Sequence, residues 1–157
     1  MKVLKFGGTS VGSAQRIKNV AALIADGQHK IVVLSAMSGT TNSLLQIADY
    51  VKVGNAAGAT ELLNTLEQKY RDVCSELGIE YVLKEYFSEL RKLCLSTYTV
   101  QTEKDIVAHG ELLSTTMMTA YLQLQGKDAV LMPALDYMRI DENEEPDLLL
   151  ITDLLNA

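Results

Sequence analysis

The sequence predicts a fold of the α/β class, with parallel strands joined by crossover helices. Two short, mainly apolar segments at residues 3–6 and 30–35 have the length of strands, and each is followed by a pattern with helical spacing. This strand-helix-strand-helix order is typical of parallel strands, because a parallel pair needs a crossover connection. The second run is continuously apolar from Ile31 to Leu34, which predicts a strand buried on both faces.

The elements follow one another from the N-terminus. The first strand is expected to end at Gly7. A helix is expected from Ser13 up to the Asp-Gly stop at 26–27, because apolar residues recur there at helical spacing. After the second strand, the small polar loop 36–41 leads into a helix that begins near Asn42.

The middle of the chain predicts a helical hairpin inserted between sheet elements. Two amphipathic apolar stripes, at 62–77 and 81–94, are separated by Gly78. Cys74 and Cys94 lie within these stripes, which indicates buried thiols in a reducing compartment.

The last third predicts a return to the sheet and then one more helix. A helical stretch is expected over 102–125, interrupted or restarted near Gly110. Residues 129–132 are expected to form a strand. After the acidic loop 141–147, the apolar segment 148–155 predicts a helix.

Composition excludes several classes of protein. A chain of 157 residues that is 48% apolar and 22% charged suits one folded domain rather than a disordered chain. The longest apolar run is six residues, whereas a membrane span needs about 20. The first residues leave no room for a secretory signal, so a cytoplasmic protein is expected.

In an α/β alternation the final helix would lead to a further strand, so the chain is expected to be a fragment.

The charge distribution points to a small anionic ligand near the start of the chain. The net charge of −6 argues against nucleic acid or an anionic membrane as a partner. Residues 1–52 carry six basic and two acidic side chains, a net charge of +4, whereas the remainder carries a net charge of −10. With two histidines and two cysteines, a Cys/His metal site is not expected.

The sharpest local feature is the segment KFGGTSVG at residues 5–12, between a predicted strand and a predicted helix. Paired glycines let backbone N–H groups approach phosphate oxygens, and the start of a helix favours negative charge. Lys5 adds a mobile positive charge. The order of residues differs from a Walker A loop and from a G-x-G-x-x-G fingerprint. An ordinary strand-to-helix turn is the alternative interpretation.

A second loop, SAMSGTTN at residues 35–42, also joins a strand to a helix. Ligands of open parallel sheets collect outside the carboxyl ends of the strands, so both loops are expected to face one crevice. The hydroxyl and amide groups of this loop suit a polar substrate. Helix N-capping by Thr41 or Asn42 is the alternative interpretation.

A third segment, HGELLS at residues 109–114, contains Glu111 at the expected start of a helix. Its carboxylate could bind an ammonium group or could only offset the helix dipole. His109 is expected to be structural, and the adjacent Met117 and Met118 are expected to fill the core.

Together the three segments resemble the aspartate kinases, members of the amino acid kinase family. The patterns K-F-G-G-T-S-V, V-L-S-A-x-x-G-x-T-N and H-G-E-x-x-S are present at 5–11, 33–42 and 109–114, in the expected order. The resemblance implies a three-layer αβα sandwich with a mainly parallel sheet. The later G-R-G-G-S-D segment, the nucleotide-binding half and the ACT domains are absent, so residues 1–157 are expected to be the N-terminal portion of a catalytic domain.

The resemblance implies ATP-dependent phosphorylation of the L-aspartate side-chain carboxylate, giving 4-phospho-L-aspartate for lysine, threonine and methionine biosynthesis. Mg²⁺ is expected to arrive with ATP rather than at a dedicated site in this chain. The parent enzyme is expected to be a homo-oligomer, and the fragment alone is expected to be inactive. Two alternatives are a related kinase acting on glutamate or a derivative, and a non-catalytic module.

The resemblance also assigns roles to individual residues. Lys5 is expected to be catalytic and to contact the transferring phosphoryl group. Thr41 and Glu111 are expected to bind aspartate, Glu111 through the substrate ammonium. The residues expected to bind the phosphates of ATP are Lys5, Phe6, Gly7, Gly8, Thr9 and Ser10.

Overall fold

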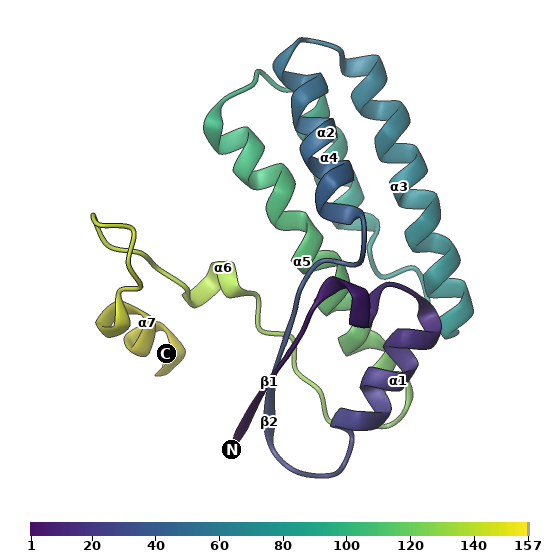
Figure 1. Ribbon diagram of the computed structural model, residues 1–157, viewed down its shortest axis with the longest axis vertical. Helices are drawn as coiled ribbons and strands as arrows, with labels where there is room; N and C mark the ends of the chain where they lie inside the picture. Colours follow the sequence, from purple (N-terminus) through teal and green to yellow (C-terminus); the bar gives the residue numbers. More distant parts are fainter. Residues whose placement is uncertain (157) are drawn as a thin grey trace.

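A computed structural model of the chain describes residues 1–156 and contains a parallel pair of strands, with one helix beside it and a bundle of helices beyond one end (Figure 1). Strand β1 (Lys2–Phe6) pairs with β2 (Lys30–Leu34), with Phe6 opposite Leu34. The crossover between them consists of the 3-10 helix η1 (Gly8–Val11) and helix α1 (Ala14–Ile24). The remaining helices are α2 (Thr40–Lys52), α3 (Ala56–Leu77), α4 (Lys84–Cys94), α5 (Val100–Leu124), α6 (Ala134–Tyr137) and α7 (Leu148–Asn156).

The α/β class and the parallel pairing are confirmed, but the sheet of the described residues has two strands, not the broad sheet of a complete sandwich. The strand expected at 129–132 is wrong, because these residues pair with no strand and Val130 is 79% exposed. The expectation that β2 is buried on both faces is also wrong. Ile31 and Val33 are each 45% exposed, since no layer within residues 1–156 covers that face of the sheet.

The predicted helical hairpin is confirmed as α3 and α4, which pack with α2 and α5 in a bundle beyond one end of the strands (Figure 1). Gly78 ends α3 in the left-handed conformation, with φ of 71°, which favours glycine. In the interior, the rings of Tyr70 on α3 and Phe87 on α4 pack in an edge-to-face arrangement at a centroid distance of 5.8 Å. This packing fixes the two helices against each other.

Glu67 forms a polar link inside the hairpin. Its buried carboxylate accepts hydrogen bonds from Tyr81 at 2.8 Å, Arg71 at 2.7 Å and Arg91 at 2.6 Å. Burial raises the pKa of Glu67, but the hydrogen bonds together outweigh burial and hold this pKa below its ordinary value. The ionised carboxylate therefore joins α3 to α4 and to the turn between them.

Helix α5 is continuous through Gly110, so the expected interruption there is wrong. It begins with a capping box in which Thr99 and Thr102 satisfy each other's backbone N–H groups. A Cβ atom at Gly110 would lie 2.8 Å from the Cβ of Ala36. The glycine is therefore explained by the close approach of α5 to the loop after β2, not by a helix boundary.

Both cysteines are free and buried, as predicted. Burial raises the pKa of Cys74 to about 11 and also raises the pKa of Cys94. The predicted core positions of Met117 and Met118 are confirmed as well.

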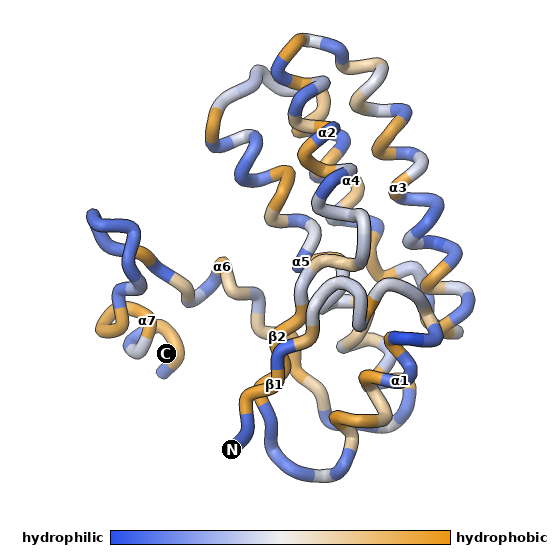
Figure 2. Tube along the Cα trace, in the orientation of Figure 1, coloured by the Kyte–Doolittle hydropathy of each residue, from blue (hydrophilic) through white to orange (hydrophobic). Residues whose placement is uncertain are grey.

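Helix α7 confirms the last predicted helix and lies with α6 away from the bundle (Figure 1). Figure 2 shows that α7 is largely hydrophobic, and Leu148 and Leu149 are 71% and 82% exposed. Across the described residues, no helix is both long and apolar enough to cross a membrane.

Candidate functional site

The two glycine-containing loops meet at the carboxyl ends of β1 and β2, as the sequence predicts. The backbone N–H of Ser38 donates to the carbonyl oxygen of Gly8 at 3.2 Å, and that of Ser35 donates to Phe6 at 3.0 Å. A Cβ atom at Gly8 would lie 2.5 Å from the carbonyl oxygen of Ala36. Because the obstacle is backbone, only glycine fits without a shift of one loop.

Lys5 lies beside the paired glycines. Its side chain is exposed, and its Nζ is 3.9 Å from the position that a Cβ atom would take at Gly7. Within residues 1–156 it forms no salt bridge. The ammonium group is therefore close to the backbone turn and free to meet an anion there.

Glu111 reaches the same place from the middle of α5. The backbone N–H of Ala36 donates to Glu111 Oε1 at 3.1 Å, and the hydroxyl of Ser114 donates to the carbonyl oxygen of Ser35 at 3.0 Å. The interpretation of Glu111 as a helix-start residue is wrong, since α5 begins at Val100. Its side chain remains exposed, so the carboxylate can contact a ligand while it holds the loop.

Thr41 lies exposed in the first turn of α2. The N-cap of α2 is Gly39, with φ of 81°, and no side chain caps the helix. Helix capping by Thr41 or Asn42 is therefore wrong, and the Thr41 hydroxyl forms no cap that would compete with a ligand.

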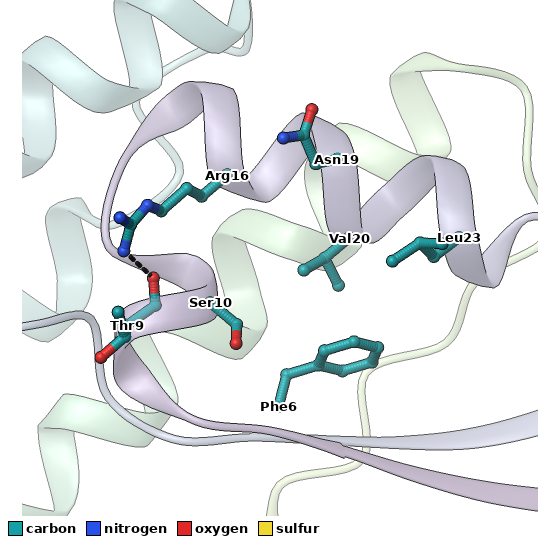
Figure 3. Close-up of a pocket in the computed structure, with 7 residues that line it drawn as sticks. All are labelled: Phe6, Thr9, Ser10, Arg16, Asn19, Val20 and Leu23. Atoms are coloured by element: carbon teal, nitrogen blue, oxygen red, sulfur yellow. Dashed lines mark hydrogen bonds between the residues drawn. The ribbon is translucent and has the colours of Figure 1, made fainter.

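Phe6, Thr9 and Ser10 line an open cavity of about 350 Å³ between the end of β1 and helix α1 (Figure 3). Arg16 crosses this region and donates to the carbonyl oxygen of Thr9 at 2.6 Å. Side chains alternate along a strand, so Phe6 and Lys5 lie on opposite faces of the sheet. The structure therefore places Gly8 against the second loop, with the Lys5 ammonium beside Gly7, and directs the Phe6 side chain towards α1.

Two residues of α3 that the sequence analysis did not assign to the site also contact the second loop. Lys69 Nζ donates to the carbonyl oxygen of Ser38 at 2.8 Å. The hydroxyl of Tyr70 lies 2.9 Å from the hydroxyl of Thr40. Tyr70 belongs to the apolar stripe of α3 and therefore has the pattern of a core residue, and the sequence near Lys69 contains no motif that marks a contact with a distant loop.

His109, next to this site, is buried between α4 and α5. Its Nδ1 lies 2.7 Å from the carbonyl oxygen of Asp105, and its Nε2 lies 3.5 Å from a carboxylate oxygen of Glu89. Among residues 1–156, no group of three or more His, Cys, Asp or Glu residues could hold a metal ion.

The comparison with protein families identifies the family of the chain. Residues 1–157 match the amino acid kinase family over their whole length. The chain belongs to the amino acid kinase family. Its members similar to this chain include "Aspartokinase 1, chloroplastic" of Arabidopsis thaliana, which is 36% identical over 137 residues, 81% of this chain and 24% of the relative. The aspartokinase of Chlamydia muridarum is 31% identical over 157 residues, covering 95% of this chain and 34% of the relative.

Solved structures of aspartokinases have a fold that matches this chain. Aspartokinase III of Escherichia coli in complex with aspartate and ADP matches 99% of this chain with a TM-score of 0.82 and 25% identity, and the match covers 37% of the solved chain. Aspartate kinase of Clostridium acetobutylicum matches 99% of this chain with a TM-score of 0.83 and 21% identity, covering 36% of its own chain; at this identity the match shows the fold alone. The chain therefore spans between about a quarter and just over a third of these relatives.

Proposed function

We propose that this chain is the leading part of a kinase catalytic domain that transfers the γ-phosphoryl group of ATP to the side-chain carboxylate of L-aspartate, giving 4-phospho-L-aspartate. The observation that carries the proposal is the direct contact of three segments distant in sequence. The loop after β2 lies against Gly8 and also bonds to Glu111. Similarity to aspartokinases, one of them solved with aspartate and ADP, supports this choice of substrates.

Phosphoryl transfer to a carboxylate needs positioning more than a strong base, because the nucleophile is already charged. In the proposed mechanism, Lys5 neutralises charge on the transferring phosphoryl group, and the backbone N–H groups around Gly7 and Gly8 hold phosphate oxygens. The exposed ammonium next to Gly7 fits this task. Mg²⁺ bound to ATP would supply further charge neutralisation.

Recognition of aspartate requires both signs of charge, since the substrate carries an ammonium and two carboxylates. We assign the ammonium to Glu111, whose carboxylate uses one oxygen for Ala36 and stays exposed. The exposed hydroxyl of Thr41 is assigned to a substrate carboxylate, for which it is a suitable donor.

The remaining assignments concern the parent enzyme. Phe6, Thr9 and Ser10 are proposed to contact ATP through the backbone of the turn that they share with the glycines. We also propose that the adenosine-binding part lies outside these residues, that the chain alone is inactive, and that the parent is a homo-oligomer in lysine, threonine and methionine biosynthesis. A reducing compartment such as the cytoplasm suits the two free, buried thiols; the Arabidopsis relative is named as chloroplastic.

The proposal is tested with a chimera in which residues 1–157 replace the matching part of Escherichia coli aspartokinase III. Hydroxylamine traps acyl phosphates, so product formation with ATP is measured for L-aspartate and for L-glutamate. The proposal predicts an aspartate-dependent hydroxamate. Glutamate-dependent product alone would favour the related kinase, and a folded chimera without either product would favour the non-catalytic module. Residues 1–157 alone, measured in parallel, are expected to give no product.

A further inference from the structure

We propose that Tyr70 is a positioning residue that, through the hydroxyl of Thr40, holds in place the second loop at residues 35–42. The inference rests on the proposed function, because it concerns how that loop presents Thr41 to aspartate. It assigns to the helical hairpin, which lies outside the three segments that resemble the family, a direct influence on the site.

The contact itself is buried and polar. Tyr70 and Thr40 are each 0% exposed, and their hydroxyl oxygens lie 2.9 Å apart. Burial raises the pKa of the Tyr70 hydroxyl, so this group stays protonated and can donate at any physiological pH. A phenylalanine would fill the apolar stripe equally well, whereas a buried hydroxyl needs a partner. The hydroxyl of Tyr70 is therefore used to hold Thr40.

The position of Thr40 matters because it is the first residue of α2 and the neighbour of Thr41. Gly39, immediately before it, has φ of 81° and forms the bend between loop and helix. On the other side of this bend, Lys69 donates to the carbonyl oxygen of Ser38 at 2.8 Å. Two consecutive residues of α3 thus hold the chain on both sides of Gly39.

The anchor is rigid because α3 is packed into the hairpin. The ring of Tyr70 packs edge-to-face with that of Phe87 on α4, which fixes where the Tyr70 hydroxyl lies. Because α3 holds the bend at Gly39, the Thr41 hydroxyl keeps one position before the substrate binds. Without this support, part of the binding free energy of aspartate would be needed to order the bend.

The first test measures the loop and needs no activity. Hydrogen–deuterium exchange is followed for the amides of Ser38 and Thr40, which donate to the carbonyl oxygens of Gly8 and Met37, in the chain and in Tyr70→Phe, which removes only the hydroxyl. Exchange of these amides is expected to accelerate about fivefold or more. The matched control is Tyr81→Phe, which removes a hydroxyl bonded to Glu67 in the same hairpin and leaves the loop untouched. Equal exchange in the two variants would overturn the proposal.

A second variant guards against a folding defect in Tyr70→Phe. Thr40→Val removes the other hydroxyl of the pair at nearly constant volume. Tyr70→Phe and Thr40→Val remove the same contact. Exchange in the double variant that combines them is therefore expected to be as fast as in each single variant, and no faster. Additive acceleration would show that the two hydroxyls act independently and would overturn the proposal.

The second test measures catalysis in the chimera with Escherichia coli aspartokinase III. Tyr70→Phe is expected to raise the KM for aspartate by about three- to tenfold, while kcat and the KM for ATP stay within about twofold. Tyr81→Phe should leave all three unchanged. An unchanged aspartate KM in Tyr70→Phe would overturn this inference alone. Failure of the unmodified chimera to use aspartate would overturn the proposed function, while the exchange experiment would still decide the role of Tyr70 in the loop.

Discussion

Glu111 bonds to the loop after β2 and is also the residue to which we assign the substrate ammonium. Its carboxylate accepts the backbone N–H of Ala36 and remains exposed beside the loop after β2. The sequence identifies this residue through its motif. It does not predict the bond to Ala36, because that contact joins residues 75 positions apart.

Glu111→Gln separates these two roles in the chimera. Glutamine keeps an oxygen that accepts the Ala36 N–H but has no charge for the substrate ammonium. Aspartate binding is expected to weaken by about 1 to 3 kcal/mol, with little change in Tm or in the KM for ATP. Glu103→Gln, on the same helix and bonded to Tyr98, is the control. A lower Tm with an unchanged aspartate KM would contradict substrate binding by Glu111.

Two glycines mark places where one element packs closely against another. Gly8 and Gly110 let η1 and α5 lie against the loop after β2, where Ala36 is the shared neighbour. The sequence predicts that the Gly7–Gly8 pair bends the chain. The reason for Gly110 could not be predicted, since the neighbour that excludes a side chain comes from another element.

Gly8→Ala tests this packing. Its new Cβ would lie 2.5 Å from the Ala36 carbonyl oxygen, so the loops must separate, and the free energy of unfolding is expected to fall by about 1 to 3 kcal/mol. Gly7→Ala is the matched control, because its Cβ would lie 3.9 Å from the flexible Lys5 Nζ. Denaturant unfolding measures both variants; an equal loss of stability would contradict the role of the backbone approach at Gly8.

The Glu67 link makes the stability of the hairpin depend on pH. The pKa of Glu67 lies below its ordinary value of 4.5, so the unfolded state takes up the proton more readily than the folded state. The stabilisation is therefore complete above about pH 4.5 and is lost as the pH falls through the folded pKa. Glu67→Gln is expected to cost about 1.5 to 3 kcal/mol at pH 7 and progressively less in acid.

Urea unfolding at several pH values checks this expectation. Glu61→Gln, on the same helix but exposed, serves as the control and should change stability little at any pH. A difference between the chain and Glu67→Gln that stays constant from pH 7 to the acid range would contradict the assignment to an ionised carboxylate.

For the whole molecule, local patterns predict the order of elements, whereas the extent of the sheet depends on distant partners. The helical hairpin and the first two strands follow from apolar spacing and from Gly78. The strand expected at 129–132 has an apolar composition but no neighbouring strand within residues 1–156. The same contrast holds for the candidate site. The motifs predict Lys5 and Glu111 as site residues, whereas no motif predicts Tyr70, which contacts the loop through tertiary packing.

In the proposed function, Lys5 at the end of β1 and the turn that follows it bind the transferring phosphoryl group of the parent enzyme, and substitution of Lys5 probes this assignment. The turnover number of the chimera with aspartate and ATP is measured for the unmodified protein and for Lys5→Met, with Lys2→Met as a control for loss of one charge from the same strand. Turnover is expected to fall on the order of 10²-fold or more in Lys5→Met and to stay near normal in Lys2→Met. A folded Lys5→Met chimera with near-normal turnover would contradict this assignment.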